Sequence, residues 1–287
     1  MTVKLCISRK ACEMRCILVA TDLSVRSDRA VQRALRLSAM LKLPCRIVSV
    51  IDSDLPDDMQ TFLKNDVEQR LSRFAQSLTA PGQEVSCKVL SGDPHEAIVD
   101  QAETDDAGLV VLGLHRPRPF RDMVQGTTMV RIVRASPRPV LLVNDTADHD
   151  YTRVLLPVSF SPACAAAMRI AGMVAPGARI QSFHAVPIPF PGFIGEGPDG
   201  ATARDLCRQA EKERDTWVAT LDPEIAVPEI EIVSAGRIET MSRMAAEKPD
   251  LIAVGAHTRV GFSPNVLGSF VTDLIKNPPC DVLVARA

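Results

Sequence analysis

Two loops of the sequence have the residue types and the spacing that bind a phosphate group. Each begins with a glycine after an apolar run, Gly113 or Gly255, and ends in a pair, Gly126–Thr127 or Gly268–Ser269. Glycines let the backbone approach an anion closely. Each pair opens a predicted helix, whose free N–H groups and dipole favour negative charge, and a hydroxyl there can donate to a phosphate oxygen. The pattern predicts an anion site at the start of both helices.

A simpler explanation of these pairs is that the hydroxyl only caps its helix. Serine and threonine are common capping residues, so Thr127 or Ser269 alone would not indicate a ligand. The loops, however, recur at one interval, because Gly113 and Gly255 are 142 residues apart and Gly126 and Gly268 are 142 residues apart. This repetition strengthens the ligand interpretation and leaves the capping interpretation open.

The elements around the loops repeat as well. The apolar run that ends at Val143 has a counterpart that ends at Ala285, and the start of the first repeat at 16–41 resembles the segment 154–175. Each repeat predicts short apolar strands that alternate with helices, with a helix at 66–78 in the first repeat and a polar loop at 53–60 before it. Such a pattern is typical of a parallel sheet covered on both faces, which binds ligands beyond the carboxyl ends of its strands.

Length and composition favour a soluble protein of two domains. The 287 residues suit two hydrophobic cores, and 46% hydrophobic with 24% charged residues is ordinary for globular proteins. A net charge of −2 argues against nucleic acid and anionic membranes as partners, and no apolar run spans a bilayer. We expect a cytoplasmic protein with an N-terminal tail at 1–13, a domain at 14–145, a linker at 146–152 and a second domain at 153–287.

Cysteine and histidine patterns do not indicate a metal site. The eight cysteines contain no C-x-x-C pair, so they are interpreted as small buried hydrophobic residues. The five histidines contain no His-Glu-x-x-His motif. We predict no metal ion other than Mg²⁺ that accompanies a nucleotide.

The sequence resembles the universal stress protein family. The segment "ILVATDLS" from Ile17 is similar to the first strand of that family, and "GAHTRVGFSPNVLGS" from Gly255 is similar to its phosphate loop, G-x-x-G-x(9)-G-[ST]. The resemblance covers nearly the whole chain as a tandem pair. It implies five-stranded α/β domains that pair through their last strands within the chain, with homodimer formation left open. It also implies binding of ATP or another adenine nucleotide, as in many members.

Each repeat departs from the family loop in a different place. Arg116 replaces the second glycine of the first loop, and Thr258 replaces it in the second. The first repeat retains the family's acid beside the adenosine as Asp22, whereas the second repeat has Ser159 there. The resemblance also implies an adenine contact at the backbone of Val50. The predicted binding residues are Asp22, Val50, Gly113, Arg116, Gly126, Thr127, Gly255, Thr258, Gly268 and Ser269.

These features predict a non-catalytic regulatory protein of the stress response, with at most a trickle of ATPase activity. The first repeat is predicted to hold adenosine, and the second to hold a small anion at Gly268 and Ser269. The alternative is an interaction module that has lost nucleotide binding and acts through protein contacts. An enzyme that uses ATP to activate a substrate would require a Ser-Gly-Gly run or a His-x-Gly-His signature, and the sequence has neither. No motif identifies the protein partners of this chain.

Overall fold

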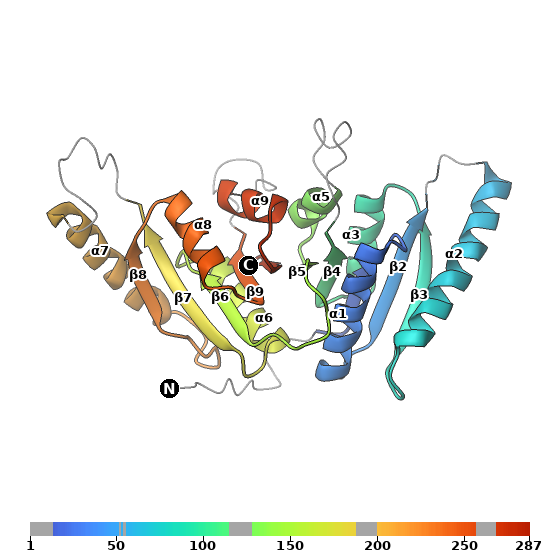
Figure 1. The fold of residues 1–287 in the computed structure, drawn as a ribbon, viewed down its shortest axis with the longest axis horizontal. Coiled ribbons are helices and arrows are strands. Elements are labelled where there is room, and N and C mark those ends of the chain that lie inside the picture. The colour runs from blue at the N-terminus through green and yellow to red at the C-terminus, as the bar shows by residue number, and fades with distance from the viewer. Residues whose placement is uncertain (1–13, 52, 54–55, 115–127, 188–199, 257–267) are drawn as a thin grey trace. The chain divides into compact units, whose positions relative to one another are not determined.

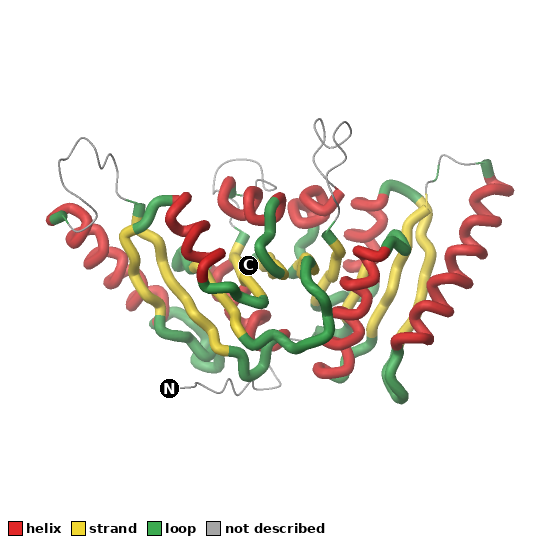
Figure 2. The backbone as a smooth tube through the Cα atoms, in the orientation of Figure 1, coloured by secondary structure: helices red, strands yellow, loops and turns green. Residues whose placement is uncertain are grey.

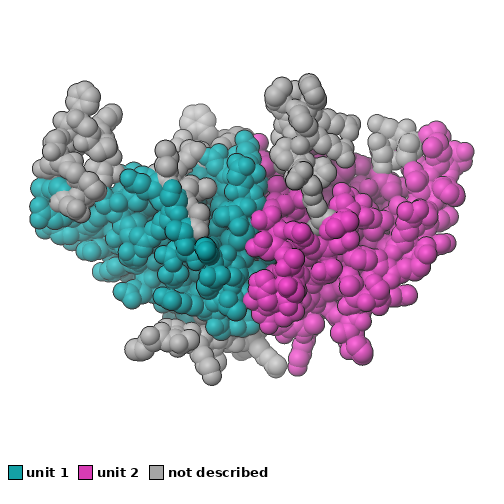
Figure 3. Space-filling view, in the orientation of Figure 1, with its two compact units in different colours: residues 1–11, 151–259, 268–287 teal, residues 12–150, 260–267 magenta. Residues whose placement is uncertain are grey.

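The computed structural model describes residues 14–51, 53, 56–114, 128–187, 200–256 and 268–287. The chain divides into two compact units, whose described parts lie on either side of the boundary between Asp150 and Tyr151 (Figure 3). We call these described parts the first half and the second half.

The two halves have the same order of elements (Figure 1). The first half consists of β1 (Ile17–Ala20), α1 (Val25–Leu41), β2 (Cys45–Ile51), α2 (Asp57–Leu78), β3 (Val85–Ser91), α3 (Pro94–Thr104), β4 (Leu109–Gly113), α5 (Thr128–Ala135) and β5 (Val140–Val143). The second half consists of β6 (Arg153–Pro157), α6 (Pro162–Val174), β7 (Arg179–Val186), α7 (Ala201–Val218), β8 (Ile230–Ser234), α8 (Arg237–Ala246), β9 (Leu251–Gly255), α9 (Ser269–Lys276) and β10 (Asp281–Ala285). The predicted repeat of alternating strands and helices is confirmed.

The described strands of each half form a parallel sheet. Their order is β3–β2–β1–β4–β5 in the first half and β8–β7–β6–β9–β10 in the second. Because β1 and β6 each lie between strands that come later in the chain, the strand order reverses beside them. Helices flank the strands of each half (Figure 2), which gives the α/β class predicted from the sequence. The carboxyl ends of β1 with β4, and of β6 with β9, are therefore the places where this fold accepts ligands.

The inner strands are short apolar runs because both of their faces are covered. Ile17, Leu18 and Val19 of β1 are completely buried, as are Leu251, Ile252 and Ala253 of β9. Burial of a side chain of this size stabilises a fold by about 1.5–3 kcal/mol. The strand ends are thus held by the core, and residues that directly follow a strand have fixed starting positions.

Helix α2 begins earlier than the sequence predicted. The expected loop at 53–60 extends too far and the expected helix start near 66 is wrong, because α2 begins at Asp57 directly after Pro56. Asp57 and Asp58 lie in its first turn, where the positive end of the helix dipole stabilises carboxylates. The polar character of this stretch belongs to an exposed helix start and not to a loop.

The segment that joins the halves is attached to α1. The side chain of Arg33, which is 1% exposed, donates from Nη1 to the carbonyl of His149 at 2.7 Å and from Nη2 to that of Thr146 at 3.0 Å. Arg36 pairs with Asp150, with 2.5 Å between Nε and Oδ1. Residues 146–150 are therefore held against the first half.

Candidate nucleotide site

Asp22 lies directly beyond the carboxyl end of β1 and is held there by hydrogen bonds. Its Oδ1 accepts from the backbone N–H of Ser24 at 3.0 Å and from the hydroxyl of Ser27 at 2.7 Å. Ser24 is the N-cap of α1 and forms a capping box with Ser27. Since both bonds are made to Oδ1, Oδ2 is the oxygen that a ligand would meet.

The same hydrogen bonds keep Asp22 ionised. Partial burial alone would raise the pKa of this carboxyl group, but the hydrogen bonds from Ser24 and Ser27 outweigh burial and lower the pKa below its ordinary value. At neutral pH the side chain is therefore a carboxylate, which accepts hydrogen bonds and donates none.

The backbone of Val50 faces the same place from β2. The N–H of Thr21 donates to the carbonyl of Val48 at 2.9 Å, so Val48 presents its backbone to β1. Alternate residues of a parallel strand face the same neighbour, and Val50 therefore also faces the β1 side. There β1 has already ended, and the chain turns away at Leu23, whose φ is 58°. Asp22 and Val50 thus border one position at adjacent strand ends.

The structure places only the ends of the two predicted phosphate loops. Gly113 is the last residue of β4, and Gly255 is the last residue of β9. Gly268 is the N-cap of α9, and Ser269 is the first residue of that helix. Arg116, Gly126, Thr127 and Thr258 lie outside the described residues.

Gly255 and Gly268 lack a side chain for different reasons. A Cβ atom at Gly255 would lie 2.5 Å from the backbone nitrogen of Cys164 and 2.6 Å from the carbonyl carbon of Ala163, so the first turn of α6 requires glycine here. At Gly268 an added Cβ would meet no atom within 4 Å. Its φ of −58° and ψ of 149° are open to any residue. Packing explains the first glycine and does not explain the second.

The second half replaces the Asp22 pair with a weaker one. The N–H of Val158 donates to the carbonyl of Phe183 at 2.8 Å, as that of Thr21 does to Val48, so Ser159 stands in the place of Asp22. Five residues after each lies its partner, Ser27 or Cys164. The Ser159 hydroxyl and the Cys164 sulfur are 3.2 Å apart. A thiol is a weak donor, and this pair presents no carboxylate to a ligand.

Leu23 and Phe160 are features of the site that sequence reasoning missed. They occupy equivalent positions after β1 and β6, and both are left-handed, with φ of 58° and 52°. This conformation costs a residue with a Cβ atom about 1–2 kcal/mol. A bulky apolar residue gives no sequence signal for it, because left-handed turns are normally recognised by glycine or asparagine.

An ion cluster at the start of α3 was also missed. Asp93 caps α3 and accepts from the backbone N–H of His95 at 2.9 Å, while Arg131 of α5 lies 3.3 Å from its other oxygen. Hydrogen bonds from His95 outweigh desolvation and lower the pKa of Asp93 to about 2. The sequence signal was an aspartate followed by proline, a typical helix start. The cluster connects α3 to the helix that follows the first loop.

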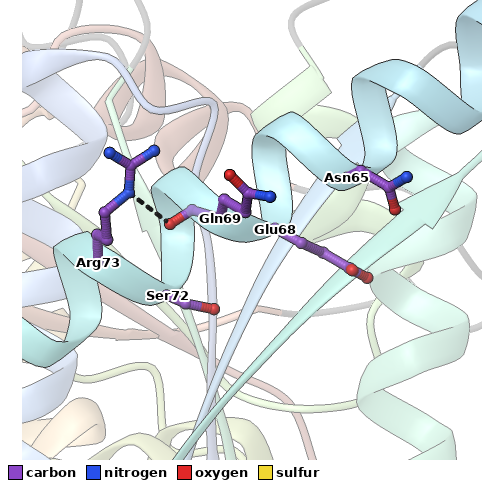
Figure 4. A pocket seen from close by; sticks show the side chains of 5 residues that line it. All are labelled: Asn65, Glu68, Gln69, Ser72 and Arg73. Atoms are coloured by element: carbon purple, nitrogen blue, oxygen red, sulfur yellow. Dashed lines mark hydrogen bonds between the residues drawn. The ribbon is translucent and has the colours of Figure 1, made fainter.

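A groove on α2 is not part of this site. It has a volume of about 620 Å³, and its described lining is a polar stripe of that helix, consisting of Asn65, Glu68, Gln69, Ser72 and Arg73 (Figure 4). None of these residues lies at a strand end.

Among the described residues, no group of three or more His, Cys, Asp or Glu side chains is arranged to hold a metal ion. No helix in the described ranges is both long and apolar enough to cross a lipid bilayer.

Comparison with known proteins assigns both halves of the chain to the same family. Residues 14–144 and 150–286 each match the Universal stress protein family. Universal stress protein MJ0577 of Methanocaldococcus jannaschii is 22% identical over 90 residues, which are 31% of this chain and 56% of that protein. The match thus spans little more than half the length of that relative.

Solved structures share the fold across nearly the whole chain. A universal stress protein from Archaeoglobus fulgidus has a TM-score of 0.67 at 17% identity and covers 96% of this chain and 99% of its own. Protein PA1789 of Pseudomonas aeruginosa PAO1 has a TM-score of 0.60 at 18% identity, with 96% and 93% covered. At these identities the likeness establishes the fold alone.

Proposed function

Because the chain belongs to the universal stress protein family, we propose that it is a regulatory protein that binds an adenine nucleotide, with the adenosine in the first half. The observation that carries this proposal is the ordered carboxylate of Asp22. Ser24 and Ser27 fix its orientation before a ligand arrives, which lowers the entropic cost of binding. Its Oδ2 accepts from a ribose hydroxyl or from the adenine amine, and Val50 offers backbone groups beside it.

The phosphates extend from adenosine toward the start of a helix. In the first half, we propose Gly113, Arg116, Gly126 and Thr127 as the loop that holds them. Arg131 lies one turn into α5, but its guanidinium pairs with the carboxylate of Asp93 at 3.3 Å, which offsets its charge. The phosphates are therefore assigned to the loop and the helix start, and any Mg²⁺ would arrive with them.

The second half is proposed to hold only a small anion. The backbone amides of Gly268 and Ser269 open α9, and Gly255 and Thr258 belong to the loop before it. We assign no catalytic residue to either half and propose that a bound nucleotide regulates contacts with other proteins.

Titration calorimetry of the full chain with ATP, ADP, AMP and adenosine tests this function. We expect all four to bind, with adenosine retaining much of the binding free energy because Asp22 and Val50 recognise that end. GTP is the matched control, since guanine has a carbonyl oxygen at the position where adenine has its 6-amino group. Absence of binding for every adenine ligand would contradict the proposal and favour the alternative of an interaction module.

A further inference from the structure

The second half has an aromatic stack at the strand end where the first half has its candidate adenosine site. Val158 donates to the carbonyl of Phe183 as Thr21 donates to that of Val48, which aligns the two halves. By this alignment Phe160 is equivalent to Leu23, and His184 is equivalent to Ser49. The rings of Phe160 and His184 are stacked, with centroids 4.3 Å apart and an angle of 21° between their planes. Both side chains are partly exposed, so their rings reach the surface at this strand end.

His184 also forms a hydrogen bond with the backbone at the end of β6. Its Nδ1 lies 2.7 Å from the carbonyl oxygen of Val158, the first residue after that strand. A carbonyl only accepts, so Nδ1 carries the proton and donates. The ring is thereby fixed over the end of β6, and Phe160 lies against it. Ser49 has no ring that could cover the equivalent end of β1.

We propose that Phe160 and His184 close the second half to adenosine, so that each chain binds one nucleotide, in the first half. This inference rests on the proposed function for the location of the first site. It adds two residues that determine specificity and a stoichiometry. Ser159 in place of the acid removes an attractive contact. The ring stack, in addition, occupies space that the ligand would need, and the carbonyl of Val158 already accepts from His184. Specificity between two similar sites commonly needs such a repulsive element.

Trp217 provides a direct optical readout of the second half. It is the only tryptophan of the chain. Its ring centroid lies 5.8 Å from that of Phe160, and the side chain is 8% exposed. A ligand that displaces Phe160 must change the surroundings of this indole, whereas a ligand confined to the strand ends of the first half contacts different elements.

The experiment combines AMP titration with Trp217 fluorescence on four forms of the full chain. They are the wild type, Asp22→Asn, Phe160→Leu/His184→Ser, and the triple variant that carries all three changes. The double change installs the side chains of the first half, and Leu23 shows that leucine adopts this left-handed turn. Thermal melts confirm folding, and each single change of the pair replaces the double variant if the latter does not fold.

We expect one AMP per wild-type chain with unchanged Trp217 emission, and at least a tenfold loss of affinity in Asp22→Asn. The triple variant should gain only weak AMP binding in the second half, because Ser159 supplies no carboxylate, and this binding should change Trp217 emission. If the wild type shows a Trp217 response to AMP that persists in Asp22→Asn, the second half is open and the proposal is overturned. The proposal is also overturned if the double and triple variants, in which Phe160 and His184 are replaced, fold but gain no AMP site. If the wild type binds no AMP, the proposed function fails. The double and triple variants then still decide the closure, since a gained site supports it and no gain overturns it.

Discussion

At the end of its first strand, the first half has the pair Asp22 and Ser27, and the second half has Ser159 and Cys164 in the same places. The backbone around both pairs is alike, since each partner lies in the first turn of a helix capped by Ser24 or Ser161. Both members differ between the halves. Asp22, which is exposed, accepts from the Ser27 hydroxyl, whereas the Ser159 hydroxyl lies beside a thiol, a weaker hydrogen-bonding group.

This difference indicates that the site is a property of pairs of side chains and not of single residues. In the proposed site, Asp22 would act together with Ser27, whose hydroxyl orients the carboxylate. The same holds for Phe160 and His184, which act on the second half together.

The largest expected effect concerns the backbone that both halves share. Gly255→Ala should destabilise the second half by about 1–3 kcal/mol, because the added methyl group overlaps the first turn of α6. Gly268→Ala is the matched control, for which loss of a favourable N-cap costs about 1 kcal/mol at most. Denaturant unfolding measures both variants. Equal stability of Gly255→Ala and the wild type would show that β9 and α6 are not packed as described.

The next effect concerns the exchange of the pairs. Ser159→Asp alone should lower stability, because the new carboxylate faces the thiol of Cys164, a weak donor. Adding Cys164→Ser supplies the hydroxyl that Asp22 has in the first half and should recover much of the loss. A double-mutant cycle of unfolding free energies should give a coupling of about 0.5–3 kcal/mol. Additive effects would contradict the paired arrangement.

A smaller effect is the acid sensitivity of the first half. The pKa of Asp93 is about 2 in the fold, below its ordinary value of 3.8. A lowered folded pKa means that the stabilisation is complete above about pH 4 and is lost as the pH falls toward 2. Asp93→Asn, which still caps α3, should remove this part of the pH dependence. The second half has Gly236 at the equivalent helix start.

Circular dichroism melts from pH 2 to pH 6 measure this difference. Asp100→Asn, on the same helix, is the control and should follow the wild type. Because the carboxylate of Asp93 is 41% exposed, solvent screens its pair with Arg131 and the shift in melting temperature should be modest. Identical curves for Asp93→Asn and the wild type would mean that the cluster does not connect α3 to α5 in solution.

The smallest effect on stability concerns Gly268. Gly268→Ser should leave stability unchanged or raise it by a few tenths of a kcal/mol, because serine is the better N-cap. The same change should weaken sulfate or phosphate binding at the start of α9, since a side chain then covers the amides. Anion-dependent melting shifts test this. An unchanged shift in Gly268→Ser would place the anion elsewhere.

The repeat and the fold were predictable because they rest on periodic patterns. Apolar runs such as 17–19 and 251–253 are readable as buried strands, and the interval between loops gives the duplication. The start of α2 was not predictable from periodicity, because its first turns are polar and exposed. The acidic residues Asp57 and Asp58 directly after Pro56 were the signal that could have located it.

The sequence indicated candidate site residues but not their arrangement. The resemblance to the family pointed to Asp22, but its hydrogen bond with Ser27 comes from the geometry of the first turn of α1. Gly255 and Gly268 looked alike in the sequence, and only the contacts of an added Cβ atom distinguish them. The Phe160–His184 stack joins residues from two strand ends, which no local pattern connects.

The central claim, that the first half holds adenosine through Asp22, is tested most directly by AMP titration of Asp22→Asn beside Ser159→Ala. Asparagine retains an oxygen for Ser24 and Ser27 but loses the charge, so Asp22→Asn should lose about 1.5–3 kcal/mol of binding free energy, roughly 10- to 150-fold in affinity. Ser159→Ala, at the equivalent position, should bind as the wild type does. Unchanged affinity in Asp22→Asn together with a loss in Ser159→Ala would contradict the account.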